Sequence, residues 1–416
     1  MSDIVIEDIM DINKLIETNE NALCDTFKKI DSVALFNQEK VLSAFQKERV
    51  ALRHFSGTTG YGYDDVGRDT LSRLYADVFA TESAIVSPLI ANGTHAISIV
   101  LFGLLRPGDV MYSVSGNPYD TLLDVISGDG VGSLKEYGVT FDKTELVNGS
   151  FDKPSIEAYL KTHSPKIIFI QRSRGYSSRD AFTIETLGDI IGFVRQFNKT
   201  AAIVVDNCYG EFVETKEPTE VGADVIVGSL IKNPGGGLAP TGGYIAGKAE
   251  YVRLASYRLT CPGIGTEVGS YNATYQYFYQ GLFIAPHTVA QTLKAAQLFC
   301  STFASLGYPV VPKAGSEYGD IIASIKFNTE QELIGFVQAV QTTSPVDSYV
   351  VPEPWDMPGY NHKVIMAAGT FVQGASIELS ADSPIKEPYI AYFQGALTYE
   401  HAKLALKACL KKILNV

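Results

Sequence analysis

The sequence predicts an α/β fold, with a mostly parallel sheet in a large domain and a small α+β domain at the C-terminal end. Short apolar runs rich in β-branched residues are typical of strands buried on both faces. Stretches with helical spacing alternate with these runs from about residue 68 to residue 247, which is the pattern of βα units. Beyond residue 285 longer helices accompany only a few strands.

The chain divides into three expected parts, namely a helical arm over residues 1–54, a large domain over 55–286 and a small domain over 287–416. In the large domain we expect strands at 84–86, 109–112, near 139, 166–170, 201–205, 223–228 and 242–247. Its main helices are expected at 71–79, 94–105 and 184–197. For the small domain the expected helices are 288–303, 330–340 and one from about 398, with strands at 321–327, 364–368 and 375–379.

Composition excludes several classes of protein. With 46% hydrophobic and 19% charged residues among 416, the chain is globular rather than disordered. Its net charge of −12 disfavours a polyanionic partner, so we expect no nucleic acid. The five cysteines form no CxxC pair, which favours a reducing cytoplasm over a disulfide framework or a metal site. The most apolar window, 84–105, is broken by Pro88 and polar residues, so we expect no membrane span.

Two chemically useful side chains follow neighbouring strands of the predicted sheet. Asp206 ends the apolar run 201–205, and Lys232 lies just beyond the run 223–228. Ligands of open α/β sheets bind at the carboxyl ends of the strands. A lysine there forms a Schiff base with a carbonyl cofactor, and a carboxylate keeps a pyridine nitrogen protonated. This pair predicts a pyridoxal 5'-phosphate (PLP) site.

A phosphate site is expected at the turn Asn92-Gly93-Thr94, which precedes a helix and supplies N–H groups at its start. The hydroxyl of Ser229 is a further donor, and Tyr119, which follows a strand, is placed to stack on a cofactor ring. Rival sites lack their motifs, because the chain contains no GxxxxGK[ST], HExxH or GxSxG sequence.

Together these residues resemble the fold-type I PLP-dependent (PLP-dependent transferase-like) enzymes. Within them the chain is similar to the cystathionine β/γ-lyase and methionine γ-lyase group, above all to its aluminium-resistance branch. The resemblance extends from about Phe55 to the C-terminus and is most specific over 60–96 and 206–247. It implies that the cofactor contacts are Asn92, Gly93, Thr94, Tyr119, Asp206, Ser229 and Lys232.

The resemblance also implies a shared site between subunits. In these lyases a Tyr-x-Arg-x-Gly loop reaches the phosphate bound by the neighbouring subunit. Here the segment from Tyr63 to Gly67 occupies that place, but Asp65 stands where the arginine is expected, and Arg68 is the nearest substitute. We therefore expect a homodimer or homotetramer with shared active sites.

The substrate end departs further from the family pattern. The lyases bind the substrate carboxylate with an arginine in a small-domain strand of the form Arg-Leu-Ser, where this chain has Glu378-Leu379-Ser380. A glutamate cannot bind a carboxylate, so another cation is needed. The candidates are Arg172 and Arg174, followed by Arg179 and Lys386.

The expected function is that of a cytoplasmic PLP-dependent C–S lyase that eliminates a thiol from a sulfur amino acid. In this reading Lys232 removes the Cα proton, Asp206 supports the ring nitrogen and Tyr119 protonates the leaving group. Two alternatives stay open, namely another PLP reaction such as that of an aldolase or decarboxylase, and a non-enzymatic PLP-fold stress protein.

Overall fold

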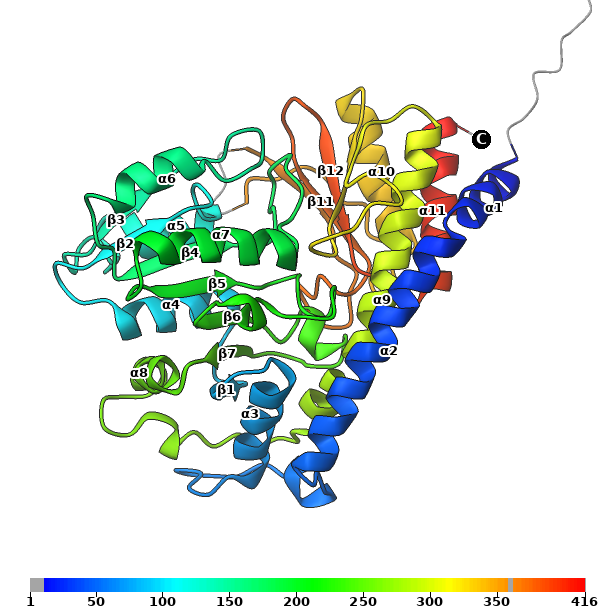
Figure 1. Cartoon of the computed structure of the whole chain (residues 1–416). Helices are drawn as coiled ribbons and strands as arrows, with labels where there is room; N and C mark the ends of the chain where they lie inside the picture. The colour runs from blue at the N-terminus through cyan, green and yellow to red at the C-terminus, as the bar shows by residue number, and fades with distance from the viewer. Residues whose placement is uncertain (1–10, 358–361, 416) are drawn as a thin grey trace, which may run out of the picture.

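A seven-stranded sheet forms the centre of the large domain (Figure 1). The computed structural model describes residues 11–357 and 362–415. The strand order is β1-β7-β6-β5-β4-β2-β3, and of these seven strands only β7 runs against the others, which confirms the mostly parallel sheet. The strands are β1 (Ser83–Ser87), β2 (Val110–Ser113), β3 (Thr140–Lys143), β4 (Ile167–Gln171), β5 (Ala202–Asp206), β6 (Val225–Ser229) and β7 (Gly243–Gly247).

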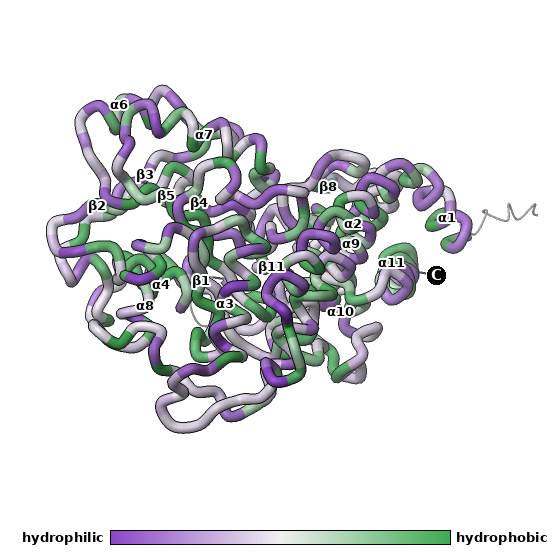
Figure 2. The backbone as a smooth tube through the Cα atoms, turned by 60° about the horizontal axis from the view of Figure 1, so that its bottom comes forward, coloured by the Kyte–Doolittle hydropathy of each residue, from purple (hydrophilic) through white to green (hydrophobic). Residues whose placement is uncertain are grey.

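Both faces of this sheet are covered by helices, because its central strands are apolar on both sides. Alternate residues of β4 enter different cores, with Ile168 and Ile170 on one face and Ile167 and Phe169 on the other. Each fully buried side chain of this size contributes about 1.5–3 kcal/mol. Figure 2 shows α4 among the most hydrophobic segments. One face carries α3 (Val66–Val78), α6 (Lys153–Leu160) and α7 (Ile184–Phe197), and the other α4 (Gly93–Leu104), α5 (Asp120–Ser127) and α8 (Ala249–Leu259).

The register of the parallel strands aligns their carboxyl ends. Gln171 at the end of β4 pairs with Asp206 at the end of β5, and Asp206 pairs in turn with Val227 near the end of β6. Loops that leave these ends therefore meet at one edge, the edge that faces the small domain.

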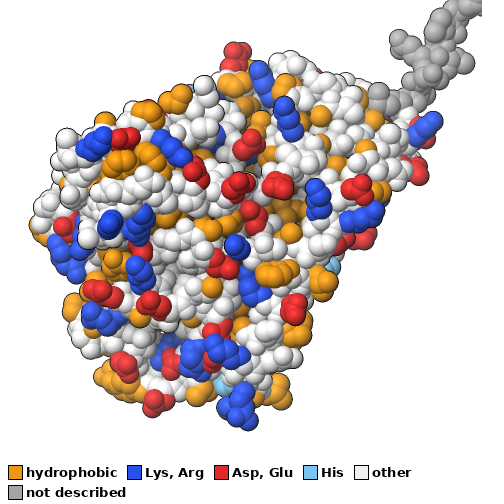
Figure 3. Space-filling view, viewed as in Figure 1, with side chains coloured by type: hydrophobic (Ala, Val, Ile, Leu, Met, Phe, Trp, Pro, Cys, Tyr) orange, Lys and Arg blue, Asp and Glu red, His pale blue; other side chains and the backbone are white. Residues whose placement is uncertain are grey.

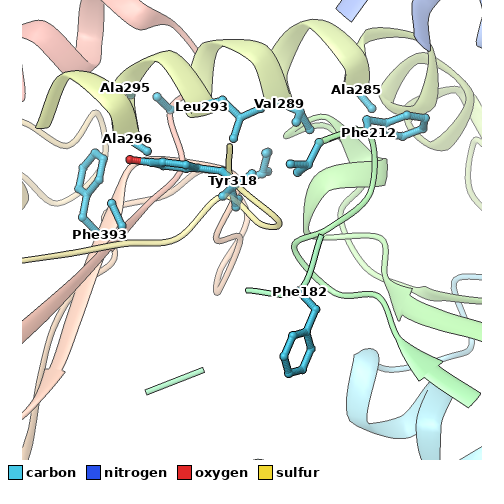
Figure 4. Packing of buried hydrophobic residues seen from close by; sticks show 14 of the residues in the cluster. Phe182, Phe212, Ala285, Val289, Leu293, Ala295, Ala296, Tyr318 and Phe393 are labelled. Atoms are coloured by element: carbon cyan, nitrogen blue, oxygen red, sulfur yellow. The ribbon is translucent and has the colours of Figure 1, made fainter. Parts of the chain in front are cut away.

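A long helix, α9 (Gln276–Ser305), connects the two domains and lies beside α2 (Cys24–Lys47) of the N-terminal arm (Figure 1). The arm also contains α1 (Ile12–Ala22). Figure 4 shows α9 side chains meeting Phe212 of the large domain at one point and Tyr318 and Phe393 of the small domain at another. The helix predicted at 288–303 begins twelve residues earlier in the structure, so the predicted division at residue 286 falls inside α9.

The small domain is built on a five-stranded antiparallel sheet of order β10-β11-β12-β9-β8. Its helices α10 (Glu330–Thr342) and α11 (Tyr399–Leu414) pack against each other. The strands are β8 (Val310–Val311), β9 (Ala323–Lys326), β10 (Val364–Ala367), β11 (Ser380–Pro384) and β12 (Ile390–Gln394). Short 3-10 helices occur at η1 (Leu52–Phe55), η2 (Pro218–Val221), η3 (Asn233–Gly235) and η4 (Gly265–Glu267).

The strand predicted at 375–379 is wrong, because this segment forms turns and the strand β11 starts only at Ser380. The cause is Glu378, whose carboxylate accepts hydrogen bonds from the N–H groups of Phe371 and Val372, both at 2.9 Å. Residues 371–378 therefore form a loop whose two ends are joined by these hydrogen bonds. Glu378 consequently lies in this loop, two residues before β11 begins.

The outer surface carries interspersed charges. On the face in Figure 3, lysine and arginine side chains alternate with aspartate and glutamate over both domains. Among residues 11–357 and 362–415, no helix combines the length and apolar character that crossing a bilayer requires.

The contact between α9 and the η3 turn leaves no room for a side chain. A Cβ on Gly281 would lie 2.3 Å from the carbonyl oxygen of Gly235. We expect Gly281→Ala to push α9 from this turn and to cost about 1–3 kcal/mol of unfolding free energy, measured by denaturant unfolding. Gly192 of α7 has no neighbour within 4 Å of such a Cβ, so Gly192→Ala is the matched control and should be neutral or slightly stabilising. Equal effects of the two substitutions would contradict the close contact.

Candidate active site

Lys232 lies immediately after β6, where the chain turns into η3. The turn is tight, with the N–H of Gly235 bonded to the carbonyl of Lys232 at 3.2 Å. The residues of η3 are buried, and α9 packs against them. The backbone of Lys232 is therefore held on one side by the sheet and on the other by the interdomain helix.

The turn after β1 lies against the ends of β5 and β6. Asn92 caps α4 by accepting a hydrogen bond from the N–H of His95 at 2.8 Å. The N–H groups of Gly93 and Thr94, in the first turn of α4, have no intrahelical partner. A Cβ on Gly93 would lie 3.1 Å from the sulfur of Cys208 and 3.5 Å from Cβ of Ser229, so the three segments meet in van der Waals contact.

Tyr119 joins the same group of residues. Its hydroxyl donates to Oγ1 of Thr94 at 2.9 Å, and its backbone N–H donates to the side-chain oxygen of Gln171 at 3.0 Å. Burial, followed by the negative charge of Asp206, raises the pKa of Tyr119 well above its ordinary value. The structure thus brings Asn92, Gly93, Thr94, Tyr119, Asp206, Ser229 and Lys232 together at one edge of the sheet.

Two site residues were not singled out from the sequence, although both belong to the Asp-Asn-Cys-Tyr-Gly run after β5. The N–H of Cys208 donates to Oδ1 of Asp206 at 3.1 Å, which fixes that carboxylate. The ring of Tyr209 lies under the Lys232 amine, with Nζ 3.9 Å from the ring centroid. The sequence did contain a signal for Tyr209, namely an aromatic residue three positions after the aspartate that ends a strand.

The charges of Lys232 and Asp206 depend on each other. Burial lowers the pKa of Lys232, but Cys208, Tyr209 and Asp206 raise it, and the pKa ends well above its ordinary value. Burial also raises the pKa of the Cys208 thiol, so this thiol is neutral near pH 7. Asp206 is then the acidic group that favours the ammonium form. Burial likewise raises the pKa of Asp206 itself, while Lys232 opposes the shift.

This arrangement fits PLP. Three groups meet where Gly93, Cys208 and Ser229 are in contact. They are the buried carboxylate of Asp206, the amine of Lys232 and the free N–H groups at the start of α4. When bound, PLP withdraws electrons from an attached amino acid and so makes its Cα–H acidic. The chain's own groups would bind its phosphate at Gly93, Thr94 and Ser229 and hold its nitrogen at Asp206. Among the residues that the structure describes, no cluster of three His, Cys, Asp or Glu side chains could hold a metal ion.

The four cations considered for the substrate carboxylate differ in their surroundings. Arg172 is fully buried, and all three of its nitrogens are bonded within the chain. Arg179 donates four hydrogen bonds to backbone carbonyls, and Lys386 is exposed. Arg174 is 2% exposed and donates from Nη2 to the carbonyl of Ile322 at 2.8 Å, while its Nε and Nη1 have no hydrogen-bond partner.

Tyr63 and Arg68 lie in a different part of the single chain. Tyr63 is 63% exposed, and its ring meets that of Tyr61 at 5.6 Å between centroids. Arg68 is buried and bonded to the carbonyls of Gly62 and Gly269 and to Asp69. The structure does not join either residue to the group around Lys232 within one subunit.

Asp65 has a structural role of its own in this loop. It caps α3 by accepting from the N–H of Arg68 at 3.0 Å, and it accepts from the hydroxyl of Tyr275 at 3.0 Å. The aspartate that stands in place of the arginine of Tyr-x-Arg-x-Gly therefore serves as the N-cap of α3.

The comparisons with known proteins agree with this geometry. The family model described as methionine gamma-lyase matches residues 12–414. The chain belongs to the methionine gamma-lyase family. The solved structure of a carbon-sulfur lyase involved in aluminium resistance from Clostridium novyi NT is 50% identical, covers 96% of this chain and 95% of its own, and superposes with a TM-score of 0.93. "Uncharacterized protein YnbB" of Bacillus subtilis is 48% identical over 93% of both chains.

More distant matches agree on the fold. The PLP-dependent protein YhfS of Escherichia coli superposes with a TM-score of 0.63 at 15% identity, and it covers 93% of this chain and 97% of its own. At that identity the match shows the fold alone, and it confirms fold type I. Membership of the methionine gamma-lyase family confirms pyridoxal 5'-phosphate as the cofactor.

A buried carboxyl lies beyond the cofactor group, in the segment that follows Tyr209. Glu211 is fully buried and accepts from the hydroxyl of Tyr244 at 2.8 Å, while its Oε2 has no partner. Burial raises the pKa of Glu211 to about 8. In an unfolded chain a glutamate has a pKa of about 4.3, so the native protein binds this proton more tightly than the unfolded chain.

Glu211 should therefore lower stability as the pH rises from about 4 to about 8, because its proton is bound in the native state and lost from the unfolded one. We expect Glu211→Gln to remove this loss, so that the variant gains on the order of a few kcal/mol over the wild type between about pH 5 and pH 8. Unfolding free energies at several pH values measure the effect. The exposed Glu185 of α7 supplies the control Glu185→Gln, which should leave the pH profile unchanged. Parallel profiles for wild type and Glu211→Gln would show that Glu211 is ionised in the folded protein.

Proposed function

We propose that this protein is a PLP-dependent C–S lyase that eliminates a thiol from a sulfur amino acid. The observation that carries the proposal is the convergence of Lys232, Asp206 and the turn at Gly93, in a chain of the methionine gamma-lyase family. The relative from Clostridium novyi NT is named a carbon-sulfur lyase. Another, from Clostridium acetobutylicum, is 52% identical over 96% of this chain and 95% of its own (TM-score 0.94) and is named as a candidate cystathionine beta-lyase involved in aluminium resistance.

The chain's own groups have distinct tasks in this proposal. Lys232 is the base that takes the Cα proton, since its amine lies among Asp206, Cys208 and Tyr119 at the strand ends. Asp206 stabilises the positive charge of the cofactor nitrogen, and burial strengthens that interaction. Tyr119 keeps its proton at neutral pH, and the nearby charge of Lys232 acts to lower the pKa of this hydroxyl, which favours transfer of the proton to the leaving thiolate.

The proposal includes a homodimer or homotetramer in the cytoplasm. Tyr61 and Tyr63 are 72% and 63% exposed at the end of a glycine-rich loop. Large exposed aromatic side chains of this kind are typical of contact surfaces. In the proposed assembly this loop and Arg68 approach the phosphate site of the neighbouring subunit.

The purified protein should release a thiol, a 2-oxo acid and ammonia from cystathionine, cysteine or methionine, and it should carry an absorbance band near about 420 nm from bound cofactor. Lys232→Ala should lose activity by about 10³-fold or more, because the proton-transfer group is gone. Lys248→Ala is the control, since Lys248 also follows a strand but pairs with Asp224. Glycine and an aldehyde, or carbon dioxide, as products would instead identify an aldolase or a decarboxylase. A protein that binds no cofactor would be non-enzymatic.

We further propose that Arg174 binds the substrate carboxylate. Of the three arginines in this loop, it is the one with two buried nitrogens that lack a partner. A buried charge without partners is costly, and an incoming carboxylate would supply two charge-assisted hydrogen bonds. Because Arg174 also bonds to Ile322 of the small domain, a carboxylate reaches it when the small domain moves away from this loop.

Arg174→Ala should lower kcat/KM by roughly 100-fold, mainly by raising KM, because one partner of a buried charge pair is lost. The cofactor absorbance should stay unchanged. Steady-state kinetics with the substrate found above measure the effect, and Lys386→Ala, an exposed cation of the small domain, is the control. An unchanged KM in Arg174→Ala, or a raised one in Lys386→Ala, would assign carboxylate binding to another group.

A further inference from the structure

The backbone of Tyr209 is in a conformation that aromatic residues rarely adopt. Its φ is 73°, in the left-handed region. For a residue other than glycine this region costs on the order of 1–3 kcal/mol, and such residues persist only where their surroundings fix them. Tyr209 lies three residues after Asp206, in the turn between Asn207 and Gly210.

The guanidinium of Arg172 forms hydrogen bonds with the first and the last residue of this turn. Its Nη1 donates to the side-chain oxygen of Asn207 at 2.8 Å and to the carbonyl of Gly210 at 3.0 Å. Its Nη2 donates to Glu214 at 2.9 Å. A Cβ on Gly210 would lie 2.5 Å from Nη1 of Arg172, so the guanidinium fills the space beside the turn. Breaking such a buried charged network costs about 3–5 kcal/mol, which exceeds the strain at Tyr209.

The strained turn directs the ring of Tyr209 to Lys232. The distance of 3.9 Å from Nζ to the ring centroid is the shortest cation–ring distance among the residues that the structure describes. The Lys232 amine makes no hydrogen bond or ion pair within the described ranges. A ring face attracts an ammonium group without forming a directed bond to it. It therefore holds the amine in place and leaves it free to react.

We propose that Tyr209 is a positioning residue for Lys232, held in a strained turn by Arg172 so that its ring face supports the lysine nitrogen. The inference rests on the proposed function, because it takes Lys232 as the residue that carries the cofactor. It concerns the ring and not the hydroxyl. It also assigns Arg172 to the support of this turn rather than to the substrate carboxylate.

The test separates the ring, the hydroxyl and the fold. Tyr209→Phe keeps the ring and removes the hydroxyl. Tyr209→Asn removes the ring but suits the turn, because asparagine adopts the left-handed region more readily than most residues. Thermal unfolding of each variant confirms that the turn is intact. The matched control is Tyr257→Leu, which removes the ring that Arg253 contacts in α8.

The readout is the pH midpoint of the absorbance change of the bound cofactor in the holoenzyme, together with the rate at which the apoenzyme regains cofactor. A ring face favours the protonated nitrogen by about 0.5–2 kcal/mol. Tyr209→Asn should therefore lower the midpoint by roughly one pH unit and slow cofactor uptake about 10-fold. Tyr209→Phe and Tyr257→Leu should match the wild type.

Two results would overturn the proposal. One is an unchanged midpoint in Tyr209→Asn, and the other is equal effects of Tyr209→Phe and Tyr209→Asn, which would assign the role to the hydroxyl. Failure of the proposed function looks different. In that case the wild type shows no cofactor band, or Lys232→Ala keeps the wild-type band.

Discussion

The guanidinium of Arg172 is the interaction on which the site depends. It is wholly buried, and its bonds tie the end of β4 to the segment that follows β5, from Asn207 to Glu214. Asp206 lies directly before this segment. Its carbonyl accepts a hydrogen bond from the backbone N–H of Arg172 at 3.1 Å, and its carboxylate accepts one from the N–H of Cys208. A buried arginine is costly unless all its donors are paired, and here all three nitrogens are. The polar network is therefore complete, and it sets the position of the cofactor-facing side chains.

The sheet and the main cofactor residues could be predicted from the sequence. The runs 166–170, 201–205 and 223–228 are apolar throughout, and such strands are recognisable without knowledge of their partners. Because they are parallel neighbours, Asp206 and Lys232 had to emerge at the same edge. The two residues thus follow from local patterns together with one topological rule.

What the sequence did not reveal depends on contacts between distant segments. The role proposed for Tyr209 depends on a backbone angle in the turn that Arg172 holds, and Arg172 follows a different strand, β4. The loop position of Glu378 follows from two N–H groups that it binds within its own loop, and this overrode a strand-like run. The early start of α9 was hidden because glycine and proline residues in its first half argue against a helix, whereas its close contact with η3 requires one of those glycines.

The contact between α9 and η3 also limits which substitutions this chain can accommodate. A Cβ on Gly236 would lie 2.5 Å from the carbonyl oxygen of Gly281, and one on Gly281 would lie 2.3 Å from that of Gly235, so a side chain at Gly236 or Gly281 would displace a helix that belongs to both domains. A change in the small domain that tilts α9 would therefore move Gly235, which lies three residues after Lys232.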